Sequence, residues 1–361
     1  MATKQVKVGI VGCGDIAYRS YLPVLTQHPR AQVTAVCDAL PERSAAAAEA
    51  FGIRSHFGDY DRFLGEADVE AVVVLTVNPA HAANTLAALR AGKHVCCEKM
   101  LAGTVAEADE IIAEASRRQL KLVVAPAVLL DGALRRVIEL VKAGAIGKPT
   151  LVRGSAAGAG PATYWGYRSD PSWFYAKGTG PMRDNGVYPL TTITGVLGPA
   201  RRVTALVGIA VPEVKLFVGP RAGETVTVEA PDNYTVLLDY GGGTFVYVDA
   251  SYVVHGQRMR PTDFFGSEGA VSLWPQWHDG PRVELYHDDP ALGVGGWLPA
   301  SAPPLGKDWT YGWSAIHLVD CIAEDKAVVV SAEHHRHVIE IMEKAEQSSL
   351  EGRTLDLTTT F

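Results

Sequence analysis

The sequence predicts two domains: an α/β domain with a doubly wound parallel sheet over residues 1–125, followed by an α+β domain with a largely antiparallel open sheet over residues 126–361. Three observations support this prediction. The chain has 361 residues, more than one hydrophobic core usually organises. Short β-branched runs alternate with helical segments as far as residue 125. Beyond that point strand-like runs follow one another with few helices between them, which is typical of antiparallel pairing.

The expected strands of the first domain show little polar alternation, as strands buried on both faces do. They cover residues 6–11, 32–37, 71–75, 93–97 and 121–125, and helical segments cover residues 16–27, 41–51, 79–91 and 105–118. We expect Asn78 to cap the third helix, with Pro79 at its first position and Gly92 just beyond its end. Strands that alternate with helices imply right-handed crossovers and a parallel sheet.

The second domain opens with an expected helix over residues 132–142. Strands follow at residues 150–155, 202–210, 234–240, 244–253 and 282–286, and helices close the chain at residues 312–324 and 332–346. Gly241-Gly242-Gly243 between two of these strands predicts a hairpin turn. Ser331 is the expected cap of the last helix.

Charge and cysteine content exclude several classes of partner. The 33 basic and 40 acidic residues give a net charge of −7, with no basic block to bind nucleic acid or anionic lipid. The five cysteines lack C-x-x-C spacing. No apolar run is long enough to span a bilayer, and the N-terminus enters a strand pattern without the layout of a signal peptide. We therefore expect a cytoplasmic protein with reduced thiols and no nucleic-acid or membrane partner.

A glycine-rich turn follows the first expected strand and opens the first helix. Its sequence, Gly12-Cys13-Gly14-Asp15-Ile16-Ala17, matches the G-x-G-x-x-G/A pattern of dinucleotide-binding turns. In this pattern the first glycine allows the tight turn and the second lets the backbone approach a pyrophosphate, which the helix N-terminus attracts. Asp38 ends the second strand, 24 residues after Gly14, where a carboxylate binds the adenosine ribose. NAD is therefore expected, while Arg43 nearby leaves NADP open.

Three further segments extend this pattern over essentially the whole chain. They are Thr76-Val77-Asn78-Pro79-Ala80-His81, Gly92-Lys93-His94-Val95-Cys96-Cys97-Glu98-Lys99 and Asp184-Asn185-Gly186-Val187-Tyr188. Together with the glycine-rich turn they resemble the Gfo/Idh/MocA oxidoreductase family, whose E-K-P signature is matched by Glu98-Lys99. The resemblance implies a Rossmann domain and a C-terminal open sheet that often mediates oligomerisation, here a homodimer or homotetramer. It also implies hydride transfer between nicotinamide and a secondary alcohol or ketone of a sugar, sugar derivative or cyclitol.

The resemblance, together with the glycine-rich turn, implies which residues face the cofactor. They are Gly12, Gly14, Asp15, Ile16, Asp38, Arg43, Thr76, Asn78, His81 and Glu98. For His81, packing near the cofactor is favoured over catalysis. The aromatic side chains of the second domain, for example Tyr164, Tyr167 and Trp173, are candidates to line the substrate pocket, although aromatic residues also fill cores.

Lys99, Tyr188 and Asp184 are the expected catalytic residues. Lys99 leaves the C-terminal end of a strand, the edge at which open α/β sheets bind ligands, and its ammonium can stabilise alkoxide character as hydride leaves. Tyr188 would act as the acid/base beside it, since a neighbouring ammonium favours phenolate. Asp184 orients the substrate hydroxyl, balances the lysine charge, or caps a helix. Because Pro189 suits a helix interior poorly, we expect that helix to begin near Asn185.

Two residues depart from the family pattern: Met100 replaces the proline after the lysine, and Val77 replaces another. Because a cis bond before a residue other than proline costs about 2.5 to 4 kcal/mol, we expect the Lys99–Met100 bond to be trans. This leaves open a catalytically silent cofactor-binding sensor. Tyr188 also resembles the dihydrodiol dehydrogenase branch, so a non-sugar alcohol is the alternative substrate.

The sequence predicts no metal site. His334, His335 and His337 lie near the start of the last helix, but no cysteine or acidic partner completes a ligand set, so a solvated face is expected. Cys13, Cys96 and Cys97 are expected to be small buried residues.

Overall fold

The structure is a computed structural model that describes residues 4–258, 260–289, 291, 293–300 and 311–361. The chain forms two compact units, Met1–Ala127 with Thr310–Ile339 and Val128–Trp309 with Glu340–Phe361. The expected division placed everything after residue 125 in one domain, whereas residues 310–339 return to the first unit. The returning helix α8 (Trp313–Ala323) contacts β5 and β6 of the first sheet. Its apolar side chains cover a sheet that precedes it by about two hundred residues, a pairing that sequence order does not reveal.

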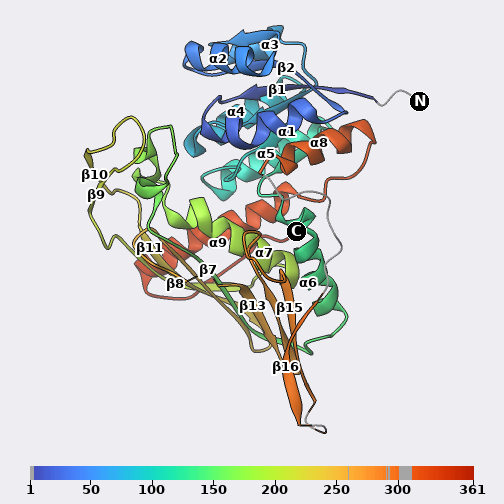
Figure 1. Cartoon of the computed structure of the whole chain (residues 1–361), viewed down its shortest axis with the longest axis vertical. Coiled ribbons are helices and arrows are strands. Elements are labelled where there is room, and N and C mark those ends of the chain that lie inside the picture. The colour runs from blue at the N-terminus through green and yellow to red at the C-terminus, as the bar shows by residue number, and fades with distance from the viewer. Residues whose placement is uncertain (1–3, 259, 290, 292, 301–310) are drawn as a thin grey trace. The chain divides into compact units, whose positions relative to one another are not determined.

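A parallel sheet forms the centre of the first unit, as predicted, and it has six strands where five were expected (Figure 1). Its strands are β1 (Val6–Val11), β2 (Ala31–Cys37), β3 (Ser55–Phe57), β4 (Ala71–Val74), β5 (His94–Cys97) and β6 (Leu122–Val124). The order β3-β2-β1-β4-β5-β6 makes β1 and β4 the two strands from which the sheet is wound in opposite directions. Ligands bind at the carboxyl ends of such strands in open α/β sheets.

Helices flank this sheet and contact one another in pairs, α1 with α8 and α4 with α5. They are a π-helical turn (Ala17–Tyr21) that runs into α1 (Leu22–Gln27), then α2 (Pro41–Phe51), α3 (Tyr60–Glu66), α4 (Asn78–Arg90), α5 (Val105–Arg117) and α8. Strand β3 and helix α3 were not predicted. Both are short, and Gly65 weakens the helical signal of α3.

The second unit is built on a nine-stranded sheet with the order β16-β15-β14-β13-β7-β12-β11-β8-β17. Its strands are β7 (Pro149–Ala157), β8 (Arg202–Gly208), β11 (Asn233–Gly241), β12 (Thr244–Ser251), β13 (Thr262–Gly266), β14 (Gly269–Leu273), β15 (Val283–Asp289), β16 (Val294–Pro299) and β17 (Leu355–Asp356), with a separate pair β9 (Glu213–Lys215) and β10 (Thr225–Thr227). The predicted glycine hairpin joins β11 to β12. All pairs in the large sheet are antiparallel except β7 with β12.

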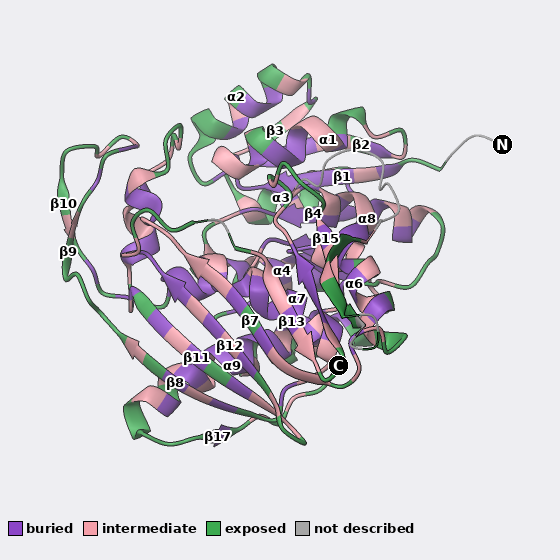
Figure 2. Cartoon of the chain, turned by 60° about the horizontal axis from the view of Figure 1, so that its bottom comes forward, coloured by how far each residue is buried: buried purple, intermediate pink, exposed green. Residues whose placement is uncertain are grey.

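Helices α6 (Gly132–Lys142) and α7 (Val187–Leu197) contact each other and this sheet. The unit also contains the short turns Val128–Leu130, Pro161–Thr163, Pro171–Tyr175 and Met182–Gly186, and most of α9 (Ala332–Glu351). Buried and exposed residues alternate along β8, β11 and β12 (Figure 2). The exposed positions include large apolar side chains, Leu206, Leu237 and Phe245, each at least half exposed. One face of this sheet is therefore open.

The expectation that His334, His335 and His337 form a solvated face is wrong, because all three side chains are buried. The predicted cap is present, with the Ser331 hydroxyl accepting a hydrogen bond from the His334 amide. Burial lowers the pKa of His334 to about 4 and that of His335 to about 3, so both rings are neutral at neutral pH. The prediction failed because histidine was treated as a polar surface residue, whereas a neutral imidazole ring can pack in a protein core.

Within the described residues, no helix combines the length and the apolar character that a membrane span requires.

Candidate active site

Four predicted cofactor or catalytic positions lie at one edge of the parallel sheet. Gly12 follows β1, Asp38 follows β2, Thr76 follows β4 and Lys99 follows β5. Because all of these strands are parallel, their carboxyl ends meet at the same edge. The first unit therefore gathers the glycine-rich turn, Asp38 and Lys99 around the point where the direction of winding reverses.

The glycine-rich turn has the geometry that a dinucleotide requires. Gly12 has φ +94°, and a Cβ built on it would lie 2.6 Å from the carbonyl carbon and oxygen of Leu75. A Cβ on Gly14, by contrast, would project into open space with no atom within 4 Å. Helical backbone begins at Asp15, so free amides of a helix N-terminus follow this space directly. The turn thus leaves a cradle at Gly14 that a pyrophosphate fits and a side chain would fill.

Asp38 holds this turn in place through both carboxylate oxygens. Oδ2 accepts a hydrogen bond from the Cys13 amide at 2.8 Å, and Oδ1 accepts one from the Leu40 amide at 2.9 Å. A carboxylate has about four acceptor positions, and the described residues supply these two donors. Arg43 is exposed in the first turn of α2. Burial and the Asp38 charge raise the pKa of the Cys13 thiol to about 12, which makes this cysteine a packing residue, as predicted.

Asp15 and Ile16 occupy the first helical positions after the turn. Asp15 forms an ion pair with Arg19 one helical turn later, with a distance of 2.9 Å between Oδ2 and Nε. This pairing offsets the carboxylate charge at a helix end that would otherwise repel phosphate.

Glu98 holds the backbone at Lys99, the predicted catalytic lysine. One carboxylate oxygen accepts a hydrogen bond from the buried Tyr21 hydroxyl at 2.6 Å, and the other accepts one from the Lys99 amide at 3.0 Å. Glu98 itself is buried. Glu98 was predicted to contact the cofactor. Its observed contacts connect the residues that follow β5 to the π-helical turn Ala17–Tyr21. Tyr21 was not predicted, because nothing in its local sequence points to Glu98, 77 residues away.

His81 joins the segments that follow β4 and β5. Its ring is buried, with Nδ1 2.7 Å from the Met100 carbonyl oxygen and Nε2 2.8 Å from the Thr76 carbonyl oxygen. Burial lowers the pKa of His81, so the neutral ring donates to one of these two oxygens. This placement agrees with the expected packing role.

The expectation of a trans Lys99–Met100 bond is wrong, because this peptide bond is cis. The expectation rested on a local preference. In the structure the Met100 carbonyl lies within hydrogen-bonding distance of the His81 ring and the Met100 side chain is buried, so tertiary contacts determine the conformation.

Asn78 does not cap α4, which is a second correction. The cap position is Val77, in extended conformation, and Asn78 is the first helical residue, followed by Pro79. Gly92 follows the helix with φ +74°, as predicted. Thr76 accepts a hydrogen bond from the Asn84 side chain through its hydroxyl. Asn78 and Thr76 therefore lie where the β4 carboxyl end meets a helix N-terminus.

In the second unit, Asp184 and Tyr188 lie on one continuous helical segment. The segment begins with the π-helical turn Met182–Gly186, preceded by Pro181, and continues into α7. The helix was expected to begin near Asn185 with Asp184 at its cap, and this is wrong because Asp184 lies inside the helical turn. Pro189 is the third residue of α7 and follows the π-helical turn directly.

The Asp184 carboxylate is held by a residue that was not predicted. The buried Tyr252 hydroxyl donates a hydrogen bond to Asp184 Oδ2 at 2.9 Å. Burial and the Asp184 charge raise the pKa of Tyr252 well above its usual value, so the phenol stays protonated and donates. Arg183, also buried, forms an ion pair with Glu346 of α9, and Glu346 accepts a hydrogen bond from Tyr234 of β11. These contacts attach the turn to the sheet and to α9.

The three aromatic residues proposed for the substrate pocket differ in their surroundings. Tyr167 and Trp173 are partly buried against a small cluster that includes Phe174 and Tyr252, and Trp173 Nε1 lies 3.3 Å from the Tyr167 hydroxyl. Tyr164 is more exposed, and its hydroxyl accepts a hydrogen bond from Asn185 at 2.9 Å. Tyr164 therefore contacts the segment that carries Asp184 and Tyr188.

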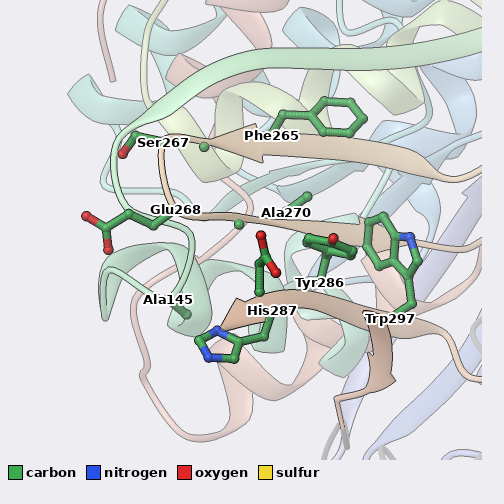
Figure 3. A pocket seen from close by; sticks show the side chains of 11 residues that line it. Ala145, Phe265, Ser267, Glu268, Ala270, Tyr286, His287 and Trp297 are labelled. Carbon is green, nitrogen blue, oxygen red and sulfur yellow. The ribbon is translucent and has the colours of Figure 1, made fainter. Parts of the chain in front are cut away.

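A shallow cavity of about 750 Å³ lies at the β13–β14 hairpin, and none of the predicted site residues line it. Its side chains do not converge. Phe265, Tyr286 and Trp297 share one face of the sheet by strand register, and His287, next to Tyr286, points to the other face (Figure 3). We assign no chemistry to it. In the described part of the chain, no group of His, Cys, Asp and Glu is arranged to hold a metal ion.

Comparison with known proteins identifies the family. Residues 6–125 match an oxidoreductase family with an NAD-binding Rossmann fold, and residues 134–272 match the GFO/IDH/MocA C-terminal domain. The chain belongs to the Gfo/Idh/MocA oxidoreductase family. The first unit thus contains the NAD-binding Rossmann domain of an oxidoreductase family.

Two curated relatives and one solved structure illustrate the range of the family. The dTDP-3,4-didehydro-2,6-dideoxy-alpha-D-glucose 3-reductase of Streptomyces violaceoruber is 36% identical over 56% of this chain and 58% of its own length. The D-apiose dehydrogenase of Paraburkholderia graminis is 26% identical over 98% of this chain and 90% of its own. The aldose-aldose oxidoreductase of Caulobacter crescentus, solved with glycerol, has a TM-score of 0.79 at 24% identity and covers 98% of this chain and 100% of its own. The similarity to this solved structure shows that the two chains share a fold.

Proposed function

We propose that this protein is an NAD(P)-dependent dehydrogenase that transfers hydride between nicotinamide and a secondary alcohol or ketone of a sugar, sugar derivative or cyclitol. The observation that carries the proposal is the edge of the parallel sheet. There the dinucleotide cradle at Gly14 and the backbone of Lys99, fixed by Glu98, belong to the same set of strand ends. The relatives named for dTDP-sugar reduction and apiose oxidation support a ring or sugar alcohol as the substrate.

In the proposed mechanism, the Lys99 ammonium donates a hydrogen bond to the carbinol oxygen and stabilises the negative charge that develops on it. Tyr188 accepts the hydroxyl proton as phenolate and returns it in the reverse reaction. Asp184, held by Tyr252, orients the substrate hydroxyl. The bound nicotinamide supplies the hydride acceptor.

The turnover assay follows absorbance of the reduced cofactor with NAD or NADP and a panel of D-glucose, D-xylose, myo-inositol and an aromatic dihydrodiol. We expect turnover with a sugar or inositol. Lys99→Ala and Tyr188→Phe should each lower kcat at least about a hundredfold, the size of an oxyanion or acid/base contribution, with little change in NAD affinity. Lys93→Ala is the matched control, because Lys93 precedes β5 at the opposite end of the strand and donates to the Val69 carbonyl. Near-normal kcat in the Lys99 and Tyr188 variants would refute their roles. A preference for the dihydrodiol would refute the substrate class.

We further propose that the protein is cytoplasmic and that it forms a homodimer or homotetramer through the open face of its large sheet. All five cysteines are free thiols. Leu206, Leu237 and Phe245 expose apolar surface on three neighbouring strands of that face. A charge at the middle of this surface, Leu237→Glu, should shift the mass measured by analytical ultracentrifugation to that of the monomer. A monomeric wild type would exclude the assembly.

A further inference from the structure

A turn of aromatic residues, Tyr164-Trp165-Gly166-Tyr167, lies shortly before the helical segment that carries Asp184 and Tyr188. The Tyr167 amide donates to the Tyr164 carbonyl at 2.9 Å and Gly166 has φ +84°, so the backbone folds back tightly. Trp165 stands at the tip of this turn. It is 80% exposed, whereas Tyr164 and Tyr167 in the same turn each make a ring contact with Phe174.

The packed neighbours give the turn a firm base. Phe174 is buried, Trp173 stacks on it with ring centroids 3.8 Å apart, and Tyr164 and Tyr167 contact it with their ring edges or at a tilt. Phe174 also belongs to a buried cluster with Tyr252, which holds Asp184. The aromatic residues around Trp165 are therefore explained by packing, whereas the exposed indole is not.

A hydrogen bond attaches the same turn to the candidate catalytic segment. Asn185 Nδ2 donates to the Tyr164 hydroxyl at 2.9 Å, and Asn185 lies between Asp184 and Tyr188 in the sequence. This bond fixes the orientation of the amide. Among the described residues, no donor contacts Asn185 Oδ1, so that oxygen is available to accept a hydrogen bond from a ligand.

The exposed Trp165 indole follows Tyr164 in the chain, and the Tyr164 hydroxyl accepts a hydrogen bond from Asn185, so these groups together suit one ligand chemistry. A six-membered polyhydroxylated ring has an apolar face of C–H bonds and a rim of hydroxyl groups. The indole face of Trp165 can stack on the C–H face of such a ring. The side chains of Asn185 and Tyr164 can form hydrogen bonds with its hydroxyl groups. An acyclic polyol has no continuous C–H face to stack on the indole.

We propose that Trp165 is the stacking platform for the ring of the substrate, with Asn185 Oδ1 accepting a hydrogen bond from a ring hydroxyl. This inference rests on the proposed function, because it names the residues that recognise the sugar or cyclitol ring. It makes Trp165 a determinant of ring binding, separate from the proton and hydride chemistry of Lys99 and Tyr188.

The experiment compares Trp165→Ala, Trp165→Phe and the matched control Trp277→Ala, whose indole is 65% exposed on a turn between β14 and β15. With the best of D-glucose, D-xylose and myo-inositol as substrate, Trp165→Ala should raise KM at least tenfold, leaving kcat, the KM for NAD and Tm nearly unchanged. Trp165→Phe should recover most of this loss because it retains an aromatic face. Trp277→Ala should match the wild type.

Saturation-transfer NMR of the same three compounds with the NAD-loaded protein separates this proposal from the proposed function. Ring C–H signals should be strong for the wild type and weak for Trp165→Ala. Binding that depends on Trp165 without any turnover would support the platform and reject the dehydrogenase assignment. Turnover with an unchanged KM in Trp165→Ala would overturn the platform alone. A change confined to Tm or to the oligomer mass would overturn it as well, because that result would assign Trp165 to folding or assembly.

Discussion

The nucleotide side and the substrate side of the candidate site are held by different kinds of contact. On the proposed nucleotide side, the backbone of the glycine-rich turn would make the contacts, and Gly12, Gly14 and the helix that follows are contiguous in the sequence. On the substrate side, side chains are positioned by residues far along the chain, as Asp184 is by Tyr252, 68 residues away. A local sequence motif can therefore specify the conformation of the backbone. The orientation of a side chain such as Asp184 depends instead on contacts with residues that are distant in the sequence.

The largest expected effect tests the nucleotide side. Gly12→Ala forces a Cβ against the Leu75 carbonyl at a φ of +94°, so it should lower Tm by several degrees and raise the KM for NAD at least about a hundredfold. Gly14→Ala meets no protein atom, so Tm should stay the same while the KM for NAD rises. Thermal denaturation and NAD titration measure the two effects. An unchanged NAD affinity in Gly14→Ala would mean that the cradle does not hold the pyrophosphate.

The same contrast explains how much the sequence could predict. Strand β1, the glycine turn, and the positions of Asp38 and Lys99 at strand ends follow from local periodicity and spacing, and the structure agrees. The helix α8 was predicted, but its packing on the first sheet was not, because the strands of that sheet lie much earlier in the chain. The burial of His334 and His335 was not predicted, because it depends on tertiary packing.

Site geometry was harder to predict than site identity. The Lys99–Met100 bond was expected to be trans from local energetics, but the His81 ring and the burial of Met100 act on it from elsewhere in the fold. Asp184 was expected at a helix cap, but the helix begins earlier through a π-helical turn, which sequence periodicity does not reveal. Tyr252 has no local signal, since a tyrosine after a strand is usually a core residue.

A smaller effect tests the substrate side. Tyr252→Phe removes the donor to Asp184 and retains the ring, so we expect kcat to fall at least about tenfold, because a hydrogen bond to a charged group is worth about 1.5–3 kcal/mol. NAD affinity should not change, since Tyr252 belongs to the second unit. Tyr247→Phe on the same strand, β12, is the control. If kcat stays at the wild-type value, Asp184 does not depend on Tyr252 for its position.

The smallest expected effect on turnover concerns a contact outside both sides of the site. Glu340 of α9 is buried and accepts hydrogen bonds from the backbone and hydroxyl groups of Thr358 and Thr359, which holds the C-terminal segment to the helix. Burial opposes its ionisation, but Lys344 and these threonine groups outweigh burial and lower the pKa of Glu340 to about 2. The folded state therefore favours the carboxylate more strongly than the unfolded chain does.

The sign of this shift sets the pH dependence of the Glu340→Gln variant. The stabilisation is fully present above about pH 4.5, the ordinary value, and is lost as the pH falls towards 2. Glu340→Gln should lower the free energy of unfolding at pH 7 by about 1–3 kcal/mol, measured by urea denaturation, and the difference from the wild type should narrow below pH 4.5. Glu333→Gln, in the first turn of the same helix, is the control. Because Glu340 acts through the C-terminal segment, kcat should be unchanged, and a fall in kcat would mean that this segment also supports the substrate side.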